Sequence, residues 1–518
     1  MEIVKANLHM DRNKCRVNTQ ITLEEDKNIS DRNPDAAGIL LDRAEVTLDE
    51  VRPGKDMVTV RGRLTYEMLI LSEEEEGLYH LQGEIPFEEK IRAEGMEAID
   101  NVEIIPGLED LRTGLINSRK LSVRALVHFE VKVVQIFDQE IPIGLTGGER
   151  LEVQKETVSQ SVVAVDRRDI LRVKEDLELP ANLPPVQEIL WKSMELGKWE
   201  IRPLEDSIGV QGEIRFFLLY EGEGEERPIK SYETAIPFSG NLECPGSRST
   251  MLSEIVPSVG EWGLSVKEDY DGEARILEAE MTLNLPVHLL ENRDWEILKD
   301  AYGTTQEVTP VYMPGYRKLM RDKYQGKVKV SQVFSPPASE TKILQVCHTE
   351  GLLLPQEVTR TEAGLEIEGL VSVNILYMTG EEGKPYKALK GEIPYSYLFE
   401  SNELTENSYW KATPSLEYCS SILLDGETIE VKIMVGLDIT LGEKWQQPFL
   451  SDLQINPLLP EKINKLPGIV VYFPGQQESL WDVGKKYMVS LDSIRSLNQL
   501  SSDMLEKNQK ILIVKEVN

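Results

Sequence analysis

Cysteine and histidine are scarce in this chain of 518 residues, and neither forms a pattern that is typical of a metal site. The four cysteines (Cys15, Cys244, Cys347 and Cys419) include no close pair, and the five histidines lie in different segments. A zinc site needs clustered cysteine or histidine ligands, and a disulfide framework needs paired cysteines. The sequence therefore predicts no metal site, no cofactor and a reducing compartment.

Long apolar runs and an excess of basic residues are also missing. No stretch approaches the roughly 18 apolar residues of a membrane helix, and the first residues lack the basic and apolar regions of a signal peptide. We therefore expect a cytoplasmic protein without direct membrane insertion. The 89 acidic residues outnumber the 57 basic ones, for a net charge of −32. Such a charge repels nucleic acid and anionic lipid, so neither is expected as a partner.

Sequence motifs of common enzymes are absent too. The chain has no Gly-x-x-x-x-Gly-Lys-Ser/Thr loop, no His-Glu-x-x-His and no Gly-x-Ser-x-Gly, which disfavours a nucleotide hydrolase, a zinc protease and a serine hydrolase. A pair of carboxylates serving a glycosidase stays open, because acids are abundant. The repeats described next leave no separate catalytic domain, so we expect no enzyme.

One motif occurs three times: a glycine, a run of large apolar residues four positions later, and an Ile-Pro-aromatic triplet. Its glycine and proline are Gly62 and Pro86, Gly212 and Pro237, and Gly369 and Pro394. The glycine-to-proline spacing is 24, 25 and 25 residues, and successive glycines lie 150 and 157 residues apart. Self-similarity at a fixed period indicates copies of one module. We expect these six residues to be structural markers, since glycine in a strand marks a bulge or a close chain approach.

Each copy has the alternating pattern of β-strands. Residues 123–131, 277–285 and 431–439 each place five apolar residues at alternate positions, as a half-buried strand requires. Many short strands separated by turns are typical of sandwiches and barrels. The predicted fold class is mainly β, with three tandem antiparallel β-sandwich or barrel-like repeats. Residues 111–118 and 294–302 are expected to form short helical turns.

The end of the chain has a different pattern. A strand at Ile469–Phe473, helices at Ser479–Tyr487 and Ser490–Asn498, and a strand at Lys510–Val514 are predicted from the apolar spacing and the caps. The order is strand, helix, helix, strand. The predicted division is repeats at 1–145, 150–300 and 310–455, a proline-marked linker at 456–467, and a small βααβ domain at 468–518.

This final domain resembles the LysM family in Tyr472, Ser479-Leu480-Trp481, Tyr487, Asn498 and Asn508 to Ile511. LysM modules typically bind N-acetylglucosamine polymers through the loop after the first strand and the loop before the second. Here Gln477-Glu478 replaces the usual Gly-Asp, and Asn508 replaces the usual glycine, which puts glycan binding in doubt and leaves protein binding open. The partner-binding residues expected are Gln477, Glu478, Ser479, Leu480 and Trp481. Trp481 has a second interpretation, as part of the small core.

The order of three β-rich repeats followed by one LysM module resembles the clostridial SipL family of spore-coat morphogenetic proteins. The repeats of that family are called SPOCS domains. The resemblance covers essentially the whole chain. It implies a scaffold for spore coat assembly during sporulation, located in the mother cell and assembling at the forespore surface. The implied partners are the coat morphogenetic ATPase (sporulation stage IV protein A) and other coat proteins. The alternatives are a peptidoglycan-binding protein of the forespore envelope and, less favoured, a wall hydrolase.

Overall fold

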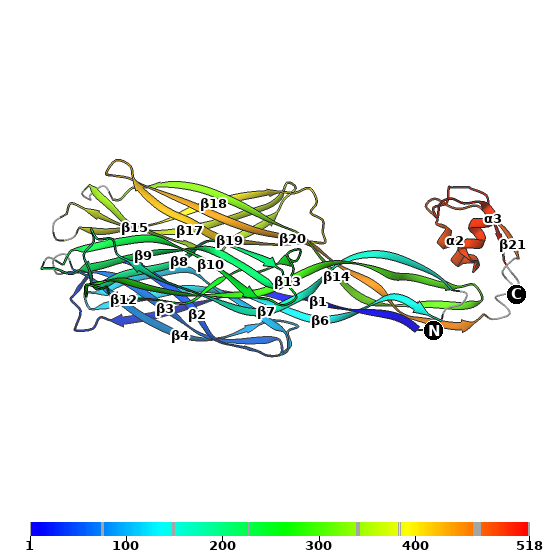
Figure 1. Cartoon of the computed structure of the whole chain (residues 1–518), viewed down its shortest axis with the longest axis horizontal. Helices are drawn as coiled ribbons and strands as arrows, with labels where there is room; N and C mark the ends of the chain where they lie inside the picture. The colour runs from blue at the N-terminus through cyan, green and yellow to red at the C-terminus, as the bar shows by residue number, and fades with distance from the viewer. Residues whose placement is uncertain are drawn as a thin grey trace.

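A computed structural model describes residues 2–73, 77–147, 151–225, 227–337, 342–381, 383, 385–458 and 468–515. The molecule is elongated (Figure 1): a broad β body narrows into a stalk of strands, and a small helical module sits beside the tip of the stalk. The expected fold class, mainly β with a βααβ module at the end, is confirmed. Most of the expected linker, residues 459–467, lies outside the described residues.

Each repeat is a sandwich of two antiparallel sheets. In the first repeat the sheets have the orders β1–β6–β5 and β2–β3–β4. The strands are β1 (Glu2–Asn28), β2 (Ala36–Pro53), β3 (Met57–Ser72), β4 (Leu78–Arg92), β5 (Asn101–Asn117) and β6 (Lys120–Thr146). Alternate residues of β3, from Val58 to Ile70, and of β6, from Leu121 to Val133, meet in one buried core. The alternation of the sequence therefore points one face of each sheet at the other.

The other two repeats follow the same plan. The second contains β7 (Leu151–Glu178), β8 (Val186–Leu204), β9 (Ser207–Gly222), β10 (Ile229–Glu243), β11 (Leu252–Ser253), β12 (Ser258–Glu268) and β13 (Ala274–Gly303). The third contains β14 (Gln306–Phe334), β15 (Ile343–Leu353), β16 (Glu357–Arg360), β17 (Gly364–Thr379), β18 (Tyr386–Glu400), β19 (Ser408–Leu423) and β20 (Ile429–Pro457). In each repeat the first strand pairs with the last, and the strand that carries the marker glycine is flanked on both sides.

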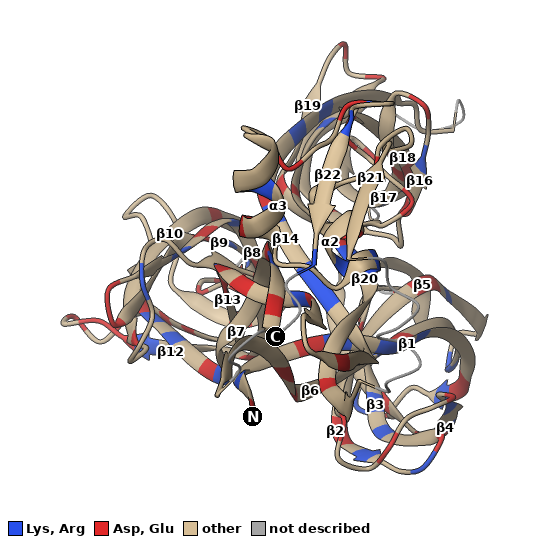
Figure 2. Ribbon diagram, turned by 90° about the vertical axis from the view of Figure 1, so that its right-hand side faces the viewer, with Lys and Arg blue, Asp and Glu red and all other residues tan. Residues whose placement is uncertain are grey.

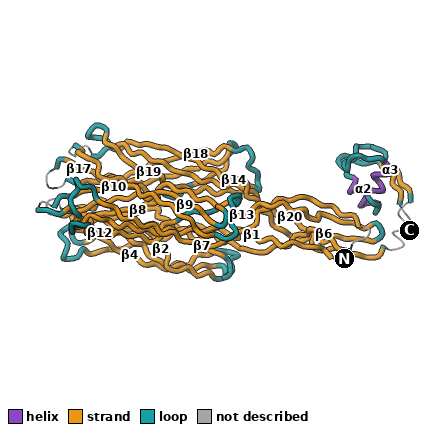
Figure 3. Tube along the Cα trace, viewed as in Figure 1, coloured by secondary structure: helices purple, strands orange, loops and turns teal. Residues whose placement is uncertain are grey.

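The stalk consists of the far halves of the longest strands (Figure 3). These strand pairs form three ribbons: ribbon one (residues 2–13 with 134–146), ribbon two (151–163 with 290–303) and ribbon three (306–320 with 442–457). Each ribbon has one β-bulge at its base and one near its tip, at matching positions. Bulges increase the local twist of a strand pair, so the same two bends recur in all three ribbons.

The three repeats surround a common axis, which is visible as three lobes in the end-on view of Figure 2. In the body, buried apolar residues from all three repeats meet, among them Leu41, Leu69, Trp191, Leu219 and Leu376. A second shared core inside the stalk includes Leu8, Ile141, Val158, Ile297 and Phe449. Burial of apolar surface is the main favourable term in folding, so these two cores join the repeats into one body.

The marker glycines lie directly opposite the aromatic residue of the Ile-Pro-aromatic triplet. Gly62 pairs with Phe87, Gly212 with Phe238 and Gly369 with Tyr395. A Cβ at any of these glycines would clash with that ring. The spacing of the motif thus corresponds to a cross-strand pair in which the ring covers the glycine. The prolines lie within the strands β4, β10 and β18 at the sheet edges, where a missing N–H is tolerated.

The two expected helical turns are wrong. Residues 111–118 lie mostly in β5, and residues 294–302 lie in β13. Both strands carry bulges, after Leu108 and Leu115 in β5 and after Leu298 in β13. A bulge inserts an extra residue, which shifts the apolar pattern by one position. The shifted pattern imitates the three-residue and four-residue spacing of a helix.

The small module contains β21 (Ile469–Tyr472), α2 (Leu480–Tyr487), α3 (Leu491–Asn498) and β22 (Ile511–Val514). Ser479 caps α2: its side chain accepts from the backbone N–H of Asp482, and the Asp482 carboxylate accepts from the backbone N–H of Ser479. This reciprocal capping box fixes where the helix begins. Apolar residues of both helices and both strands form a separate core, which consists of Leu480, Val483, Val489, Ile494, Leu505, Ile511 and Ile513.

Candidate functional site

The two loops that were expected to bind a partner lie side by side on the small module. The first loop joins β21 to α2, and the second joins α3 to β22. Ser479 forms an isolated β-bridge with Met504, and the N–H of Asn508 donates to the carbonyl of Pro474 at 3.0 Å. We call the residues of these two loops that follow β21 and the C-cap of α3, 473–479 and 500–510, the loop surface.

Two residues of the loop surface have left-handed backbones. The φ angle is +65° at Gln477 and +61° at Asn508, in the region that glycine adopts most easily. These are the positions at which the sequence departs from the usual LysM glycines. The loops therefore keep the backbone conformation of glycine while adding two polar side chains, and Gln477 is exposed.

Glu478 holds the first loop together. Its carboxylate accepts hydrogen bonds from the hydroxyl of Tyr472 at 2.7 Å and from the N–H of Gly475 at 2.8 Å. The bond from Gly475, followed by that from Tyr472, lowers the pKa of Glu478. The ammonium of Lys486 lies 4.7 Å from the centre of the Tyr472 ring. Glu478 is therefore an ionised anchor inside the loop.

Ser479 and Leu480 support the helix. Ser479 is the N-cap described above, and its hydrogen bonds lower the pKa of Asp482. Leu480 is 0 % exposed and lies in the module's core. Of the five expected partner-binding residues, these two therefore have structural roles within the module: Ser479 caps α2, and Leu480 packs in the core.

Trp481 packs against the stalk. Its side chain is 8 % exposed, and its ring meets Tyr302 of β13 edge-on, with 4.9 Å between the ring centres. Its indole N–H donates to the Asp300 carboxylate at 3.0 Å. The sequence offered core packing or partner binding for this residue, and the structure places it against another part of the same chain. Tyr302 was missed because it lies in the segment expected to be helical.

Two exposed apolar side chains complete the loop surface. Phe473 is 57 % exposed and Met504 is 59 % exposed, and they belong to the first and second loop respectively. Neither was singled out from the sequence. Their signal was weak: Phe473 ends an alternating strand, and Met504 stands in a polar stretch. With Gln477, they give the loop surface the mixture of apolar and polar groups that a binding surface needs.

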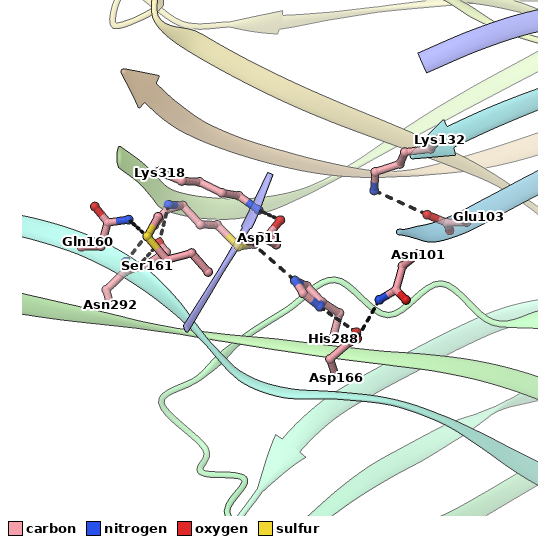
Figure 4. A network of polar contacts seen from close by, with 12 residues as sticks. Asp11, Asn101, Glu103, Lys132, Gln160, Ser161, Asp166, His288, Asn292 and Lys318 are labelled. Atoms are coloured by element: carbon pink, nitrogen blue, oxygen red, sulfur yellow. Dashed lines mark hydrogen bonds and ion pairs between the residues drawn. The ribbon is translucent and has the colours of Figure 1, made fainter. Parts of the chain in front are cut away.

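A second concentration of polar residues lies near the base bulges of ribbons one and three, and Figure 4 shows these side chains from close by. The ammonium of Lys318 in β14 lies 2.6 Å from the carboxylate of Asp11 in β1, and both side chains are almost fully buried. Burial alone would lower the pKa of Lys318, but the charges of Glu254 and Asp11 outweigh it and raise that pKa. His288 hydrogen-bonds Asp166 at 3.1 Å. The ion pair between Asp11 and Lys318 joins the first repeat to the third, so it is a structural contact between repeats.

Two further features of the described ranges concern metal ligands and membrane helices. Within them, no group of three or more histidine, cysteine, aspartate or glutamate residues is arranged to hold a metal ion. Among those same residues, no helix has the length and apolar character needed to cross a membrane.

Comparisons with protein families support the repeat and tail assignments. A family model described as the SipL SPOCS domain matches residues 35–116 and 185–267, which span most of the first and second sandwiches. A LysM domain model matches residues 476–514. No curated protein and no solved structure gives a significant match.

The third repeat lies outside the matched residues, yet it has the same strand pairings. Its central strand β17 pairs with β18 so that Gly369 faces Tyr395, as Gly62 faces Phe87 in the first repeat. Its outer strands β14 and β20 form ribbon three. The chain therefore has a SipL-like architecture, in which SPOCS domains precede a C-terminal LysM domain.

Proposed function

We propose that this protein is a non-enzymatic scaffold of the spore coat that binds the coat morphogenetic ATPase and other coat proteins at the forespore surface. The observation that supports it best is the combination of SPOCS domains with a LysM domain, which fits a coat-associated protein of sporulating cells. The LysM module acts as the protein-binding part, and the mother cell is the location.

The loop surface is the proposed contact with the ATPase. Phe473 and Met504 offer apolar area that is already exposed, and Gln477 lies between them in sequence. Exposed aromatic and apolar anchors often carry most of the binding energy of an interface. Glu478 and Ser479 would support this surface from behind.

The test is a pull-down with the intact chain and a Gln477→Trp variant. The baits are the coat ATPase and washed peptidoglycan. The bulky side chain should block the loop surface and reduce capture by the ATPase. Gln499→Trp is the matched control, because Gln499 is also exposed and also has a left-handed backbone, with φ of +54°, but caps α3. If both variants are captured equally well, the loop surface is not the contact.

A peptidoglycan-binding protein of the forespore envelope is the second candidate. The glycine-like backbones of Gln477 and Asn508 favour it, because the loops keep a LysM shape. Retention of the intact chain by peptidoglycan, with no capture by the ATPase and no retention of a chain truncated after residue 466, would replace our proposal with this one. Restoring the usual residues with Gln477→Gly and Asn508→Gly should then strengthen retention.

A further inference from the structure

The LysM module rests on ribbon two, although the chain enters the module from the end of ribbon three. Besides the contacts of Trp481, the ammonium of Lys485 lies 2.5 Å from the Asp300 carboxylate. The hydroxyl of Tyr302 donates to the backbone carbonyl of Val489 at 2.8 Å. Tyr302 is 3 % exposed and Trp481 8 %, so the aromatic part of the contact is buried. Asp300 and Tyr302 are the stalk side of this contact, and α2 with the turn that follows it is the module side.

The two sides fit each other closely. Gly484 stands in the middle of α2, where glycine costs about 1 kcal/mol relative to alanine. A Cβ at this position would clash with the hydroxyl of Tyr302 and with a methyl group of Leu491. The glycine thus leaves room for the tyrosine ring as well as for the next helix. Asp300 receives both charged and neutral donors from the module, Lys485 and Trp481.

Only ribbon two offers this combination. Asp300 directly follows the tip bulge of its ribbon, and the equivalent residues are Gly144 in ribbon one and Asp452 in ribbon three. Two positions later, where ribbon two has Tyr302, the other ribbons have Thr146 and Gln454. Ribbons two and three both have an aspartate after the tip bulge, Asp300 and Asp452, so the aspartate does not explain why the module contacts ribbon two. The tyrosine at position 302 does, because ribbon three has a glutamine there.

The contact is also separable from the fold of the module. Trp481 is absent from the module's core, which is built from both helices and both strands. The loop surface stays exposed at Phe473 and Met504 while the contact is closed. Stable protein interfaces use roughly 20–30 residues a side, far more than this contact. Opening would thus expose Trp481 and Tyr302 without breaking either core.

We propose that this contact is a latch, which fixes the LysM module to ribbon two and opens reversibly. While it is closed, the Trp481 face of α2 is withheld from any partner, and the loop surface remains available. When it is open, both faces of the module are available. This is independent of which molecule the module binds.

The test uses the full chain labelled with 5-fluorotryptophan and fluorine NMR. The signal of Trp481, assigned by its loss in Trp481→Phe, should be broad and protected from a soluble gadolinium reagent. In Tyr302→Ala it should narrow several-fold and become quenchable, because a released small module tumbles faster than the whole chain. Gln454→Ala, at the equivalent position of ribbon three, should leave the signal as in the unaltered chain.

Two results would overturn the latch. One is a narrow, quenchable Trp481 signal in the unaltered chain, which would mean that the contact is not formed. The other is a broad, protected signal in folded Tyr302→Ala. If Tyr302→Ala does not fold, Asp300→Asn provides the same test, because it removes the ion pair with Lys485 while keeping the shape of the side chain.

Discussion

The interiors of the three sandwiches and the axis between them follow different rules. Inside the sandwiches, equivalent positions are apolar in every repeat: Val60, Val210 and Ile367 are all buried. On the axis, equivalent positions differ in chemistry. Three residues before the unpaired residue of the base bulge stand Asp11, Ser161 and Lys318, and Asp11 pairs with Lys318.

In the body, too, equivalent positions of the three repeats differ in chemistry where the sandwiches meet. Arg43 and Glu350 occupy equivalent positions in the first and third repeats, where the second has Ser193. The guanidinium of Arg43 lies 3.7 Å from the Glu350 carboxylate, which also accepts from the indole of Trp191 at 2.7 Å. Opposite charges at equivalent positions cannot occur in a trimer of identical subunits. The axis thus shows that the repeats have specialised to fit one another within one chain.

Removing the axial lysine should have the largest effect. Lys318→Met leaves Asp11 and Glu254 without their cation, and breaking one side of a buried ion pair costs about 3–5 kcal/mol. The measurement is the free energy of unfolding in urea. The control is Lys5→Met, because Lys5 pairs with Glu140 on the exposed surface of ribbon one and such pairs contribute about 1 kcal/mol or less. Equal losses would show that the axis tolerates an unpaired charge.

The second-largest effect should come from acid, which should weaken the contact between Arg43 and Glu350 in the body. Burial alone would raise the pKa of Glu350, but its neighbours His348 and Arg43 lower it to about 2 from 4.5. A folded-state pKa below the unfolded value stabilises the protein above the unfolded pKa, and this contribution is lost as pH falls from 4.5 toward 2. The shift corresponds to about 3 kcal/mol. Over this range, stability of Glu350→Gln should fall less than that of the unaltered chain; parallel curves would exclude Glu350 as the cause.

Substitution of the marker glycines tests whether equivalent positions inside the sandwiches contribute equally to stability. Gly62→Ala should cost about 1–3 kcal/mol, as overpacking does, because the new methyl group meets the backbone carbonyl of Thr47 as well as Phe87. Gly369→Ala should cost less, because the three atoms nearest to its new methyl group all belong to the far end of the Tyr395 side chain, which can move more easily than a backbone carbonyl. Gly38→Ala is the control, since its Cβ has open space. Thermal unfolding of the three variants would rank them, and equal costs would refute the distinction.

The smallest expected effect concerns the latch between the LysM module and ribbon two. If the ATPase uses the Trp481 face, opening the latch with Tyr302→Ala should strengthen capture by a few-fold, because a binding-competent state that is partly populated reduces apparent affinity by that fraction. Titration of the ATPase against both chains measures this. Gln454→Ala should bind like the unaltered chain. Unchanged binding by Tyr302→Ala would limit the ATPase contact to the loop surface.

Sequence reasoning was most accurate where neighbouring residues decide the structure. The alternation of residues 121–133 follows from one buried face of β6, and the cap at Ser479 follows from a local hydrogen-bonding pattern. The pairing of Glu2 with Thr146 joins residues 144 positions apart, and no local pattern encodes such a contact. The ribbons and the bulges in β5 and β13 were missed for this reason.

The candidate site divides in the same way. Gln477 to Trp481 were singled out because they belong to a recognisable local motif, and the structure shows the contacts of Glu478 to Trp481. Asp300 and Tyr302 were not found, because they are separated from Trp481 by about 180 residues and their own segment has an irregular apolar pattern. A contact between distant segments of one chain leaves no spacing in the sequence.

Joining three repeats in one chain also sets the valency of the molecule. Three separate one-repeat chains around the same axis would carry three LysM modules, one at each ribbon. Here three ribbons share a single module, and Tyr302 on ribbon two gives it one seat. Within the described residues the chain thus carries one loop surface at the tip, so binding to the loop surface should saturate at one partner per chain.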